Sequence, residues 1–259
     1  MTVVELAKEI LPGLDKRTSG ELRKQLTKRG VEFKLNTSID EIDDKTVNFS
    51  DGEKKEFDAV LIAVGRAPLT ENIGLDNVNI ASENGFINVD LDTFETSVAN
   101  IFALGDIVNN TPQLAHAAFA EAISAITYIA SGEKKPLDYK AIPYVVYTRP
   151  ELAEIGLNAE KAKLENIEIE QSQHSFAGVG RAMITEQNQG LVKVYAEKEG
   201  PIVGASVCGP SAGEMIHEIM YMVGWEALPE EAAEFIHAHP TLSEAVGESL
   251  LGLTGKGLH

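Results

Sequence analysis

The sequence predicts a mixed fold, an α/β unit followed by an α+β domain, for three reasons. Short apolar strands alternate with a capped helix before residue 65. A hairpin pattern and a long amphipathic helix follow residue 190. Finally, 259 residues with 44% hydrophobic content suffice for a buried core in one large or two modest domains. We expect three blocks, residues 1–80, 81–137 and 138–259.

The composition narrows the class of protein. With 22 Lys and Arg against 40 Asp and Glu, the net charge is −18, which disfavours binding to nucleic acid or to an anionic membrane. The longest apolar runs are too short to span a bilayer, and no export signal is visible at the start. The lone Cys208 excludes an internal disulfide. We therefore expect a cytoplasmic protein.

The pattern at the start of the first block, residues 1–80, predicts a strand, a helix and a second strand. Residues 2–5 form a strand pattern, and a helix is expected to begin near Thr18, where Thr18 and Glu21 fit a capping box. Gly30 follows the predicted helix end, and residues 31–39 form the next strand pattern.

Two further patterns complete this block. Residues 46–57 predict a hairpin that turns at Asp51 and Gly52. The apolar run 59–65 predicts a strand that is buried on both faces.

The central block combines short strands with one helix. Residues 85–106 predict strands and turns that end at a Gly-Asp pair. An alanine-rich helix is expected over about 112–130, with Thr111 as N-cap, Pro112 in the first turn and Gly132 after its end. Residues 131–143 form the best linker candidate.

The last block predicts an α+β domain. Its elements are a strand over 143–148, a helix that opens at Asn158, a hairpin over 190–209 and a long helix over 213–228. Short helices follow around the sequence "IHAHPTLSEA".

Several single residues are candidates for cofactor binding. Glu5 closes the first strand, where an acidic residue can bind the ribose hydroxyls of NAD, although many plain strands also end in Glu. Gly65 would let a ligand approach the backbone, or form a tight turn. Asp106 could bind a sugar or ribityl hydroxyl, with the positive end of the next helix nearby, or be an ordinary turn residue.

Two histidines near the C-terminus are candidates for a base. His239 could be oriented by Glu244, which leaves its other ring nitrogen for a substrate. Glu244 also fits a capping box with Thr241, and the two roles are compatible. We interpret His237 as packing or hydrogen-bonding support for this loop.

The remaining histidines and the cysteine predict no chemistry. His217 is interpreted as a packed helix residue, and His174 and His259 have no neighbour at metal-ligand spacing, so we expect no metal site. Cys208 is expected to be an inert core thiol in an apolar strand.

Taken in order, these motifs resemble one known family. Glu5 on a strand, "VGRAP" at 64–68, "QLAH" at 113–116, "YTRPELAEIG" at 147–156 and "HAHPTLSEA" at 237–245 closely resemble the pyridine nucleotide-disulfide oxidoreductases. Within that family the pattern is most similar to the dihydrolipoyl dehydrogenases, the flavoproteins of the 2-oxoacid dehydrogenase complexes. The resemblance covers essentially the whole chain.

The resemblance implies a fold and a role for each matching residue. It implies a truncated Rossmann-like NAD-binding unit, a central segment that contacts FAD, and an α+β dimerisation domain. Glu5, Gly65 and the backbone at Ile39 would contact NAD. Asp106 would bind the ribityl chain of FAD. The residues along the flavin pyrimidine ring would be Gln113, Leu114, Ala115 and His116.

His239, paired with Glu244, would accept the proton of the dithiol across a homodimer, and the partner would be a lipoyl domain. The family's C-x-x-x-x-C disulfide and G-x-G-x-x-G loop are absent, so we expect a C-terminal portion, a fragment or a truncated reading frame. The alternatives are a non-catalytic dimerising or docking fragment, or a relative such as glutathione reductase, whose NADP the acidic Glu5 disfavours. Leu69 departs from the Asn often found after "GRxP".

Overall fold

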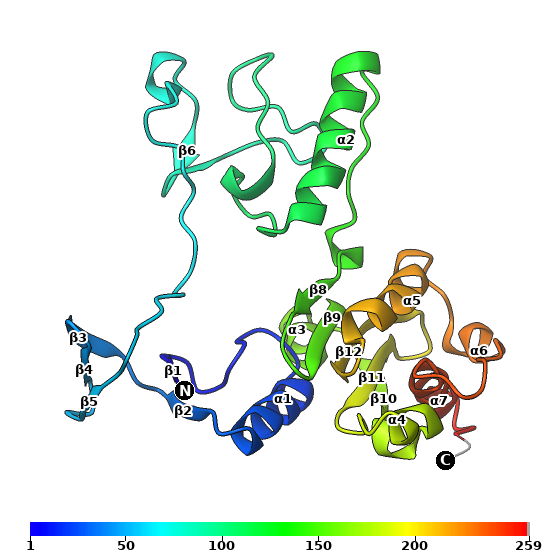
Figure 1. The fold of residues 1–259 in the computed structure, drawn as a ribbon. Coiled ribbons are helices and arrows are strands. Elements are labelled where there is room, and N and C mark those ends of the chain that lie inside the picture. The colour runs from blue at the N-terminus through cyan, green and yellow to red at the C-terminus, as the bar shows by residue number, and fades with distance from the viewer. Residues whose placement is uncertain (258–259) are drawn as a thin grey trace. The chain divides into compact units, whose positions relative to one another are not determined.

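The computed structural model describes residues 1–257, and these form two compact units (Figure 1). One unit combines residues 1–60 with the chain from 140 onward, and the other spans residues 61–139. His259, which the sequence analysis considered as a metal ligand, lies outside the described residues. Among residues 1–257 no helix is long and apolar enough to cross a membrane.

The larger unit is built on a five-stranded antiparallel sheet. Its strand order is β10-β11-β12-β9-β8. The predicted strand near 143–148 and the hairpin over 190–209 are confirmed, whereas the sequence analysis did not predict β9 and β10. The strands are β8 (Tyr144–Val146), β9 (Glu151–Gly156), β10 (Ile169–Ser175), β11 (Leu191–Glu197) and β12 (Ile202–Gly209).

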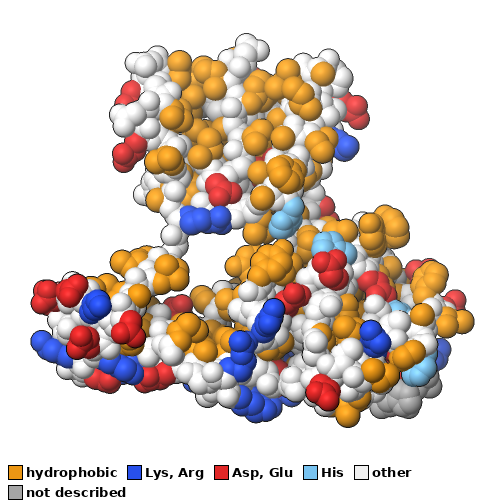
Figure 2. All heavy atoms as spheres, in the orientation of Figure 1, with side chains coloured by type: hydrophobic (Ala, Val, Ile, Leu, Met, Phe, Trp, Pro, Cys, Tyr) orange, Lys and Arg blue, Asp and Glu red, His pale blue; other side chains and the backbone are white. Residues whose placement is uncertain are grey.

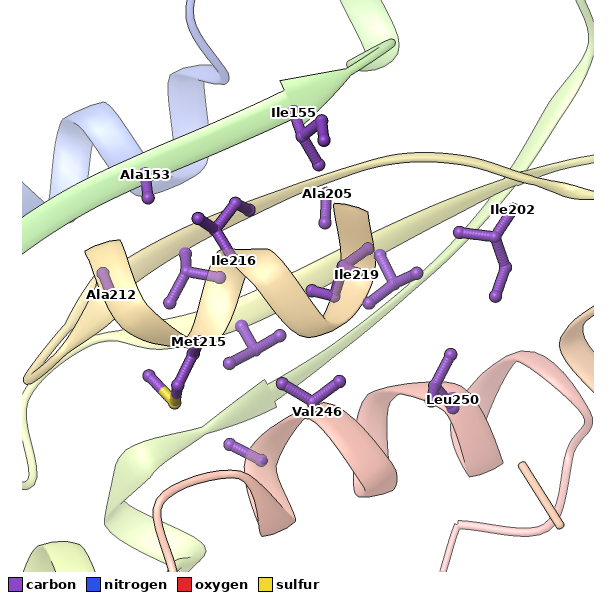
Figure 3. Packing of buried hydrophobic residues seen from close by; sticks show 14 of the residues in the cluster. Ala153, Ile155, Ile202, Ala205, Ala212, Met215, Ile216, Ile219, Val246 and Leu250 are labelled. Atoms are coloured by element: carbon purple, nitrogen blue, oxygen red, sulfur yellow. The ribbon is translucent and has the colours of Figure 1, made fainter. Parts of the chain in front are cut away.

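Helices α5 (Ala212–Gly224) and α7 (Glu244–Leu253) pack against this sheet through the main hydrophobic core. Figure 3 shows Ile216 and Ile219 of α5 and Val246 of α7 within this core. The expected helix after Asn158 is confirmed, because the Asn158 side chain caps α3 by accepting from the Lys161 N–H at 2.9 Å. The short elements are α3 (Ala159–Glu165), η4 (Phe176–Gly178), α4 (Gly180–Ile184) and α6 (Pro229–Ala232).

The other face of the sheet is covered by the N-terminal segment. Strands β1 (Thr2–Glu5) and β2 (Glu32–Leu35) pair in parallel, and α1 (Lys16–Lys28) connects them. Because side chains alternate along a strand, Leu152 and Cys208 point away from the main core and join a second apolar cluster with Leu22.

The predicted start of the first helix was wrong by a few residues. Asp15, not Thr18, is the N-cap, since its carboxylate accepts the backbone N–H of Thr18 at 2.9 Å. Gly30 follows the helix end with φ +86°, as expected. The strand predicted over 31–39 ends at Leu35, because Asn36 adopts a left-handed conformation.

A small antiparallel sheet follows. It is formed by β3 (Ile39–Asp43), β4 (Thr46–Phe49) and β5 (Lys54–Glu56). The predicted hairpin over 46–57 is confirmed, with Gly52 at positive φ in its turn.

The buried strand predicted over 59–65 was wrong. Leu61 and Val64 are 90% and 93% exposed, and this segment pairs with no strand among the described residues. An apolar run forms a buried strand only when other strands and helices cover it, and residues 1–257 do not supply that cover here.

The smaller unit contains η1 (Leu75–Asn77), β6 (Ser82–Glu83), β7 (Phe86–Ile87), η2 (Gly105–Ile107) and α2 (Ala115–Ser131). The helix predicted from Pro112 begins at Ala115, because Leu114 is still extended, so Thr111 is not its N-cap. Gly132 ends this helix in a left-handed conformation, as predicted. The element η3 (Tyr139–Ala141) follows within the predicted linker.

Candidate functional site

The loop before α7 places a histidine beside a carboxylate. The Nδ1 atom of His239 lies 2.7 Å from Oε1 of Glu244, the first residue of α7. The second oxygen of Glu244 accepts the backbone N–H of Thr241 at 2.8 Å. One carboxylate therefore contacts both the histidine and the turn before α7. Only the Glu244 half of the expected capping box is formed, because Ser243 is the N-cap of α7 and the Thr241 hydroxyl donates to the carbonyl oxygen of Ala238 at 2.7 Å.

The electrostatics of this pair favour a proton acceptor. Burial alone would raise the pKa of Glu244, but the hydrogen bonds from His239 and Thr241 outweigh it and lower that pKa. An ionised Glu244 accepts a hydrogen bond, so Nδ1 of a neutral His239 carries the proton and Nε2 is the basic nitrogen. The His239 side chain is 76% exposed, which leaves this nitrogen accessible.

His237 supports the same loop from inside. Its Nε2 atom lies 2.6 Å from Oε1 of Glu218 on α5, and this hydrogen bond raises the pKa of His237. Gly247 of α7 passes close to the ring, since a Cβ there would lie 2.6 Å from Nδ1 of His237. The hydrogen-bonding role interpreted from the sequence is thus confirmed.

The smaller unit brings together three of the expected contact regions. Arg66, which follows Gly65, donates to Oδ2 of Asp106 at 3.2 Å and also to the carbonyl oxygen of Gln113. The side-chain amide of Gln113 donates to the backbone oxygen of Asp106 at 3.2 Å. Residues far apart in the sequence therefore form one cluster, although the sequence analysis assigned no role to Arg66.

The start of α2 lies directly after this cluster. Leu114 is its N-cap and makes no side-chain cap hydrogen bond. The Asp106 side chain is 47% exposed and keeps a carboxylate oxygen that Arg66 does not contact. This end of the helix fits an electron-rich ring edge, and Asp106 fits a hydroxyl-bearing chain.

A buried carboxylate that the sequence analysis missed holds this region in place. Glu121 of α2 is fully buried and accepts the backbone N–H of Gly105 at 2.6 Å and the hydroxyl of Tyr139 at 3.0 Å. Burial, together with the charge of Glu121, raises the pKa of Tyr139. The only signal in the sequence was a single Glu among apolar and small residues of the helix.

The expected NAD contacts are divided between the units. Glu5 ends β1, and its Oε1 accepts the backbone N–H of Ala7 at 2.8 Å, so one carboxylate oxygen stays available for a hydroxyl. Ile39 begins β3 and is 40% exposed. Gly65 lies in the smaller unit with φ +135°, and a Cβ there would meet nothing within 4 Å.

The remaining candidate residues, Cys208 and His217, differ in their burial. Cys208 is buried in β12, and burial raises the pKa of its thiol to about 12, as expected of an inert core cysteine. His217 is exposed on α5, so the packing expected for it was wrong, although Ile216 and Ile219 beside it are core residues. Among residues 1–257 no three His, Cys, Asp or Glu side chains gather as metal ligands would.

Comparison with known proteins identifies the family. The pyridine nucleotide-disulphide oxidoreductase profile matches residues 1–122, and the dimerisation-domain profile of the same family matches residues 142–250. The chain belongs to the pyridine nucleotide-disulphide oxidoreductase family. Members of this family use FAD and a pyridine nucleotide, as the sequence analysis expected for this chain.

Individual members of this family match the chain over nearly its full length. It is 36% identical to the mitochondrial dihydrolipoyl dehydrogenase of Pisum sativum, over all of this chain and 53% of that protein. It is 40% identical to the dihydrolipoyl dehydrogenase of Geobacillus stearothermophilus, over all of this chain and 56% of that protein. The crystal structure of LpdA from Mycobacterium tuberculosis aligns with a TM-score of 0.87 at 26% identity, covering 97% of this chain and 56% of that one. The chain thus spans about half the length of the relatives it matches.

Proposed function

We propose that this chain is part of an FAD-dependent dihydrolipoyl dehydrogenase, which oxidises protein-bound dihydrolipoamide to lipoamide with NAD⁺ as acceptor in a 2-oxoacid dehydrogenase complex. The observation that supports it best is the contact between His239 and Glu244, in the loop that carries "HAHPTLSEA". Relatives named as dihydrolipoyl dehydrogenases, which match the whole chain, support the same assignment.

In this proposal His239 accepts a proton from the dithiol at Nε2 while Glu244 holds Nδ1. The resulting thiolate is the species that attacks a disulfide. Oxidation removes two electrons and two protons from the dithiol, and NAD⁺ takes a hydride while one proton leaves. The sole cysteine, Cys208, is buried, so the disulfide under attack lies outside these 259 residues.

The cofactor contacts follow from the same resemblance and from the geometry. FAD, when bound, relays the electron pair between the dithiol chemistry and NAD. Asp106 would bind its ribityl hydroxyls, and the first turn of α2, from Gln113 to His116, would lie along its pyrimidine edge. Glu5 would bind the ribose hydroxyls of NAD through its available carboxylate oxygen.

We further propose a homodimer in which His239 serves the other subunit. The dimerisation-domain match supports it, as do the exposed apolar side chains of Tyr221, Trp225, Phe235 and Ile236, of which the last two are close in sequence to His239. The catalytic partner would be a lipoyl domain. The division of the chain into blocks 1–80, 81–137 and 138–259 also remains a proposal. The cytoplasmic location also stays a prediction, since some relatives are named as mitochondrial.

The decisive test replaces His239 by Gln in the full-length flavoprotein. We expect dihydrolipoamide oxidation to fall by about a hundredfold or more, as for loss of a general base, while bound FAD, read from its visible absorbance, is unchanged. His217→Gln is the matched control, because His217 is an exposed histidine of the same domain. Activity that survives His239→Gln would place the base elsewhere and leave Glu244 as a cap alone.

A second test separates the enzyme from a binding fragment. The 259-residue chain alone should show no lipoamide turnover, because its single cysteine cannot form the redox disulfide and its thiol is buried with a raised pKa. It should bind FAD weakly at most, because the family's nucleotide-binding glycine loops are absent from its sequence. Measurable turnover by the purified chain would contradict the need for a disulfide from elsewhere.

A further inference from the structure

A cavity of about 840 Å³ opens between the end of α1 and the loop that joins β8 to β9. A second hollow of about 450 Å³ shares Arg29 and Arg149 with it and includes Tyr147. All of these residues lie in the larger unit. None of them has a role in the proposed dithiol chemistry.

The cavity is positively charged in a strongly acidic chain. Lys28, Arg29 and Arg149 line it, and among the described residues none of the three is ion-paired with a carboxylate. Other cations do find such partners, as Lys34 does in Asp51 and Glu53. Figure 2 shows Lys and Arg side chains gathered over α1. Three clustered cations that are left without carboxylates create a local field that attracts an anion.

The one carboxylate among the described lining residues is already engaged. Oε2 of Glu151 accepts the backbone N–H of Gly213, at the start of α5, at 3.0 Å. This hydrogen bond turns the carboxylate toward the helix. The cavity therefore keeps an excess of positive charge, three cations against one anion.

The walls of the cavity are held by hydrogen bonds. Nη1 of Arg29 donates to the carbonyl oxygen of Arg149 at 2.7 Å, which links α1 to the loop. The hydroxyl of Thr148 donates to the carbonyl oxygen of Pro150 at 2.7 Å and fixes the loop itself. A guanidinium carries five N–H donors, so Arg29 keeps several for a ligand.

We propose that this cavity binds a phosphate-bearing anion of the size of a nucleotide di- or triphosphate. Guanidinium groups recognise phosphate oxygens in a fork geometry, and Lys28 adds a point charge. Gln187, Gln189 and Ser211 line the same cavity and supply neutral hydrogen-bonding groups. The volume falls within the range of about 300–1,000 Å³ that is usual for small-molecule sites.

The exposed ring of Tyr147 favours a nucleotide over a bare phosphate chain. It lines the adjoining hollow and offers a flat face on which a base can stack. Neither Glu5 nor Asp106 nor any residue of α2 lines this site, so its residues differ from those proposed to contact NAD and FAD.

Calorimetric titration of the 259-residue chain tests the proposal, with tripolyphosphate and ATP as the probes in metal-free buffer. We expect one binding event per chain, which Arg149→Ala weakens by about tenfold or more, as for loss of a charged hydrogen bond. Arg17→Ala is the matched control, since Arg17 is an exposed arginine of α1 that does not line the cavity. The affinity of this variant for the probes should stay within about twofold of that of the unaltered chain.

The two probes show whether the cavity recognises the phosphate chain alone or a whole nucleotide. Equal affinity for both would assign recognition to the phosphate chain, and tighter ATP binding that Tyr147→Ala abolishes would assign it to a nucleotide. Lys28→Gln repeats the test if Arg149→Ala alters the thermal melting curve. No binding of either probe at millimolar concentration, or equal weakening by Arg149→Ala and Arg17→Ala, would overturn the proposal.

Discussion

The hydroxyl of Tyr195 donates a 2.5 Å hydrogen bond to the carboxylate of Asp15, which joins the start of α1 to strand β11 of the C-terminal sheet. Lys193 reaches the same oxygen at 3.3 Å, and the backbone N–H of Asp15 donates to Glu154 at 2.7 Å. All four residues are buried. The N-terminal segment is therefore fastened to the dimerisation domain by a polar joint as well as by the apolar cluster around Leu22.

Asp15→Ala should destabilise the larger unit strongly. It leaves the cation of Lys193 and the hydroxyl of Tyr195 buried without their partner, a change that costs about 3–5 kcal/mol in comparable buried pairs. Urea unfolding followed by Trp225 fluorescence measures the loss. Lys16→Ala breaks only the exposed pair with Glu160 and should cost about 0–1 kcal/mol. Similar losses in both variants would show that the joint contributes little.

The pair of His237 and Glu218 should make stability depend on pH. The pKa of His237 is raised in the folded protein, chiefly by the hydrogen bond to Glu218, so this contribution is full below the unfolded pKa of about 6.5. It is lost as the pH rises through the higher folded pKa. The difference in melting temperature between the protein and His237→Gln should therefore shrink from mildly acidic to alkaline pH. A difference that stays constant over this pH range would contradict this.

The two roles of Glu244 can be separated by stability. Glu244→Ala removes the acceptor of the Thr241 N–H and should lower the free energy of unfolding by about 1 kcal/mol, as for loss of a cap. His239→Gln keeps that hydrogen bond and should change the stability little, because its ring is mostly exposed. Chemical denaturation of the two variants measures this. Equal losses would mean that the contact with His239, and not the cap, stabilises the loop.

Local patterns in the sequence were enough to predict many elements. Gly30 and Gly132 ended their helices as expected, and Asn158 capped α3, because caps and turns depend on nearby residues. The contact of His239 with Glu244 was also predictable, since only five positions and one turn separate the two residues.

Features that depend on distant parts of the chain were not predicted. The apolar run 59–65 matches a buried strand in composition, but its neighbours decide whether it is covered. Asp15 and Tyr195 meet across 180 positions, and no periodicity reports such a contact. The role of Arg66 likewise required knowing that residues 65–66 and 106 lie together.

Because Glu121 is buried, replacing it should destabilise the smaller unit locally. Glu121→Ala would leave the N–H of Gly105 and the hydroxyl of Tyr139 without their acceptor, and each unsatisfied buried donor costs about 1–3 kcal/mol. Tyr139→Phe removes only the second donor and should cost less. Because Trp225, the single tryptophan, lies in the other unit, amide hydrogen exchange over residues 100–131 is the suitable measurement.

Exchange should accelerate throughout α2 in Glu121→Ala and change only slightly in Tyr139→Phe. Glu133→Ala serves as the control, because Glu133 is an exposed carboxylate just after the same helix. Since Glu121 anchors the turn that presents Asp106, the proposed contact of Asp106 with FAD also predicts that Glu121→Ala in the full-length protein releases FAD more readily. If exchange in Glu121→Ala matched that in Glu133→Ala, the buried carboxylate would not be what holds Gly105 and Asp106 against the start of α2.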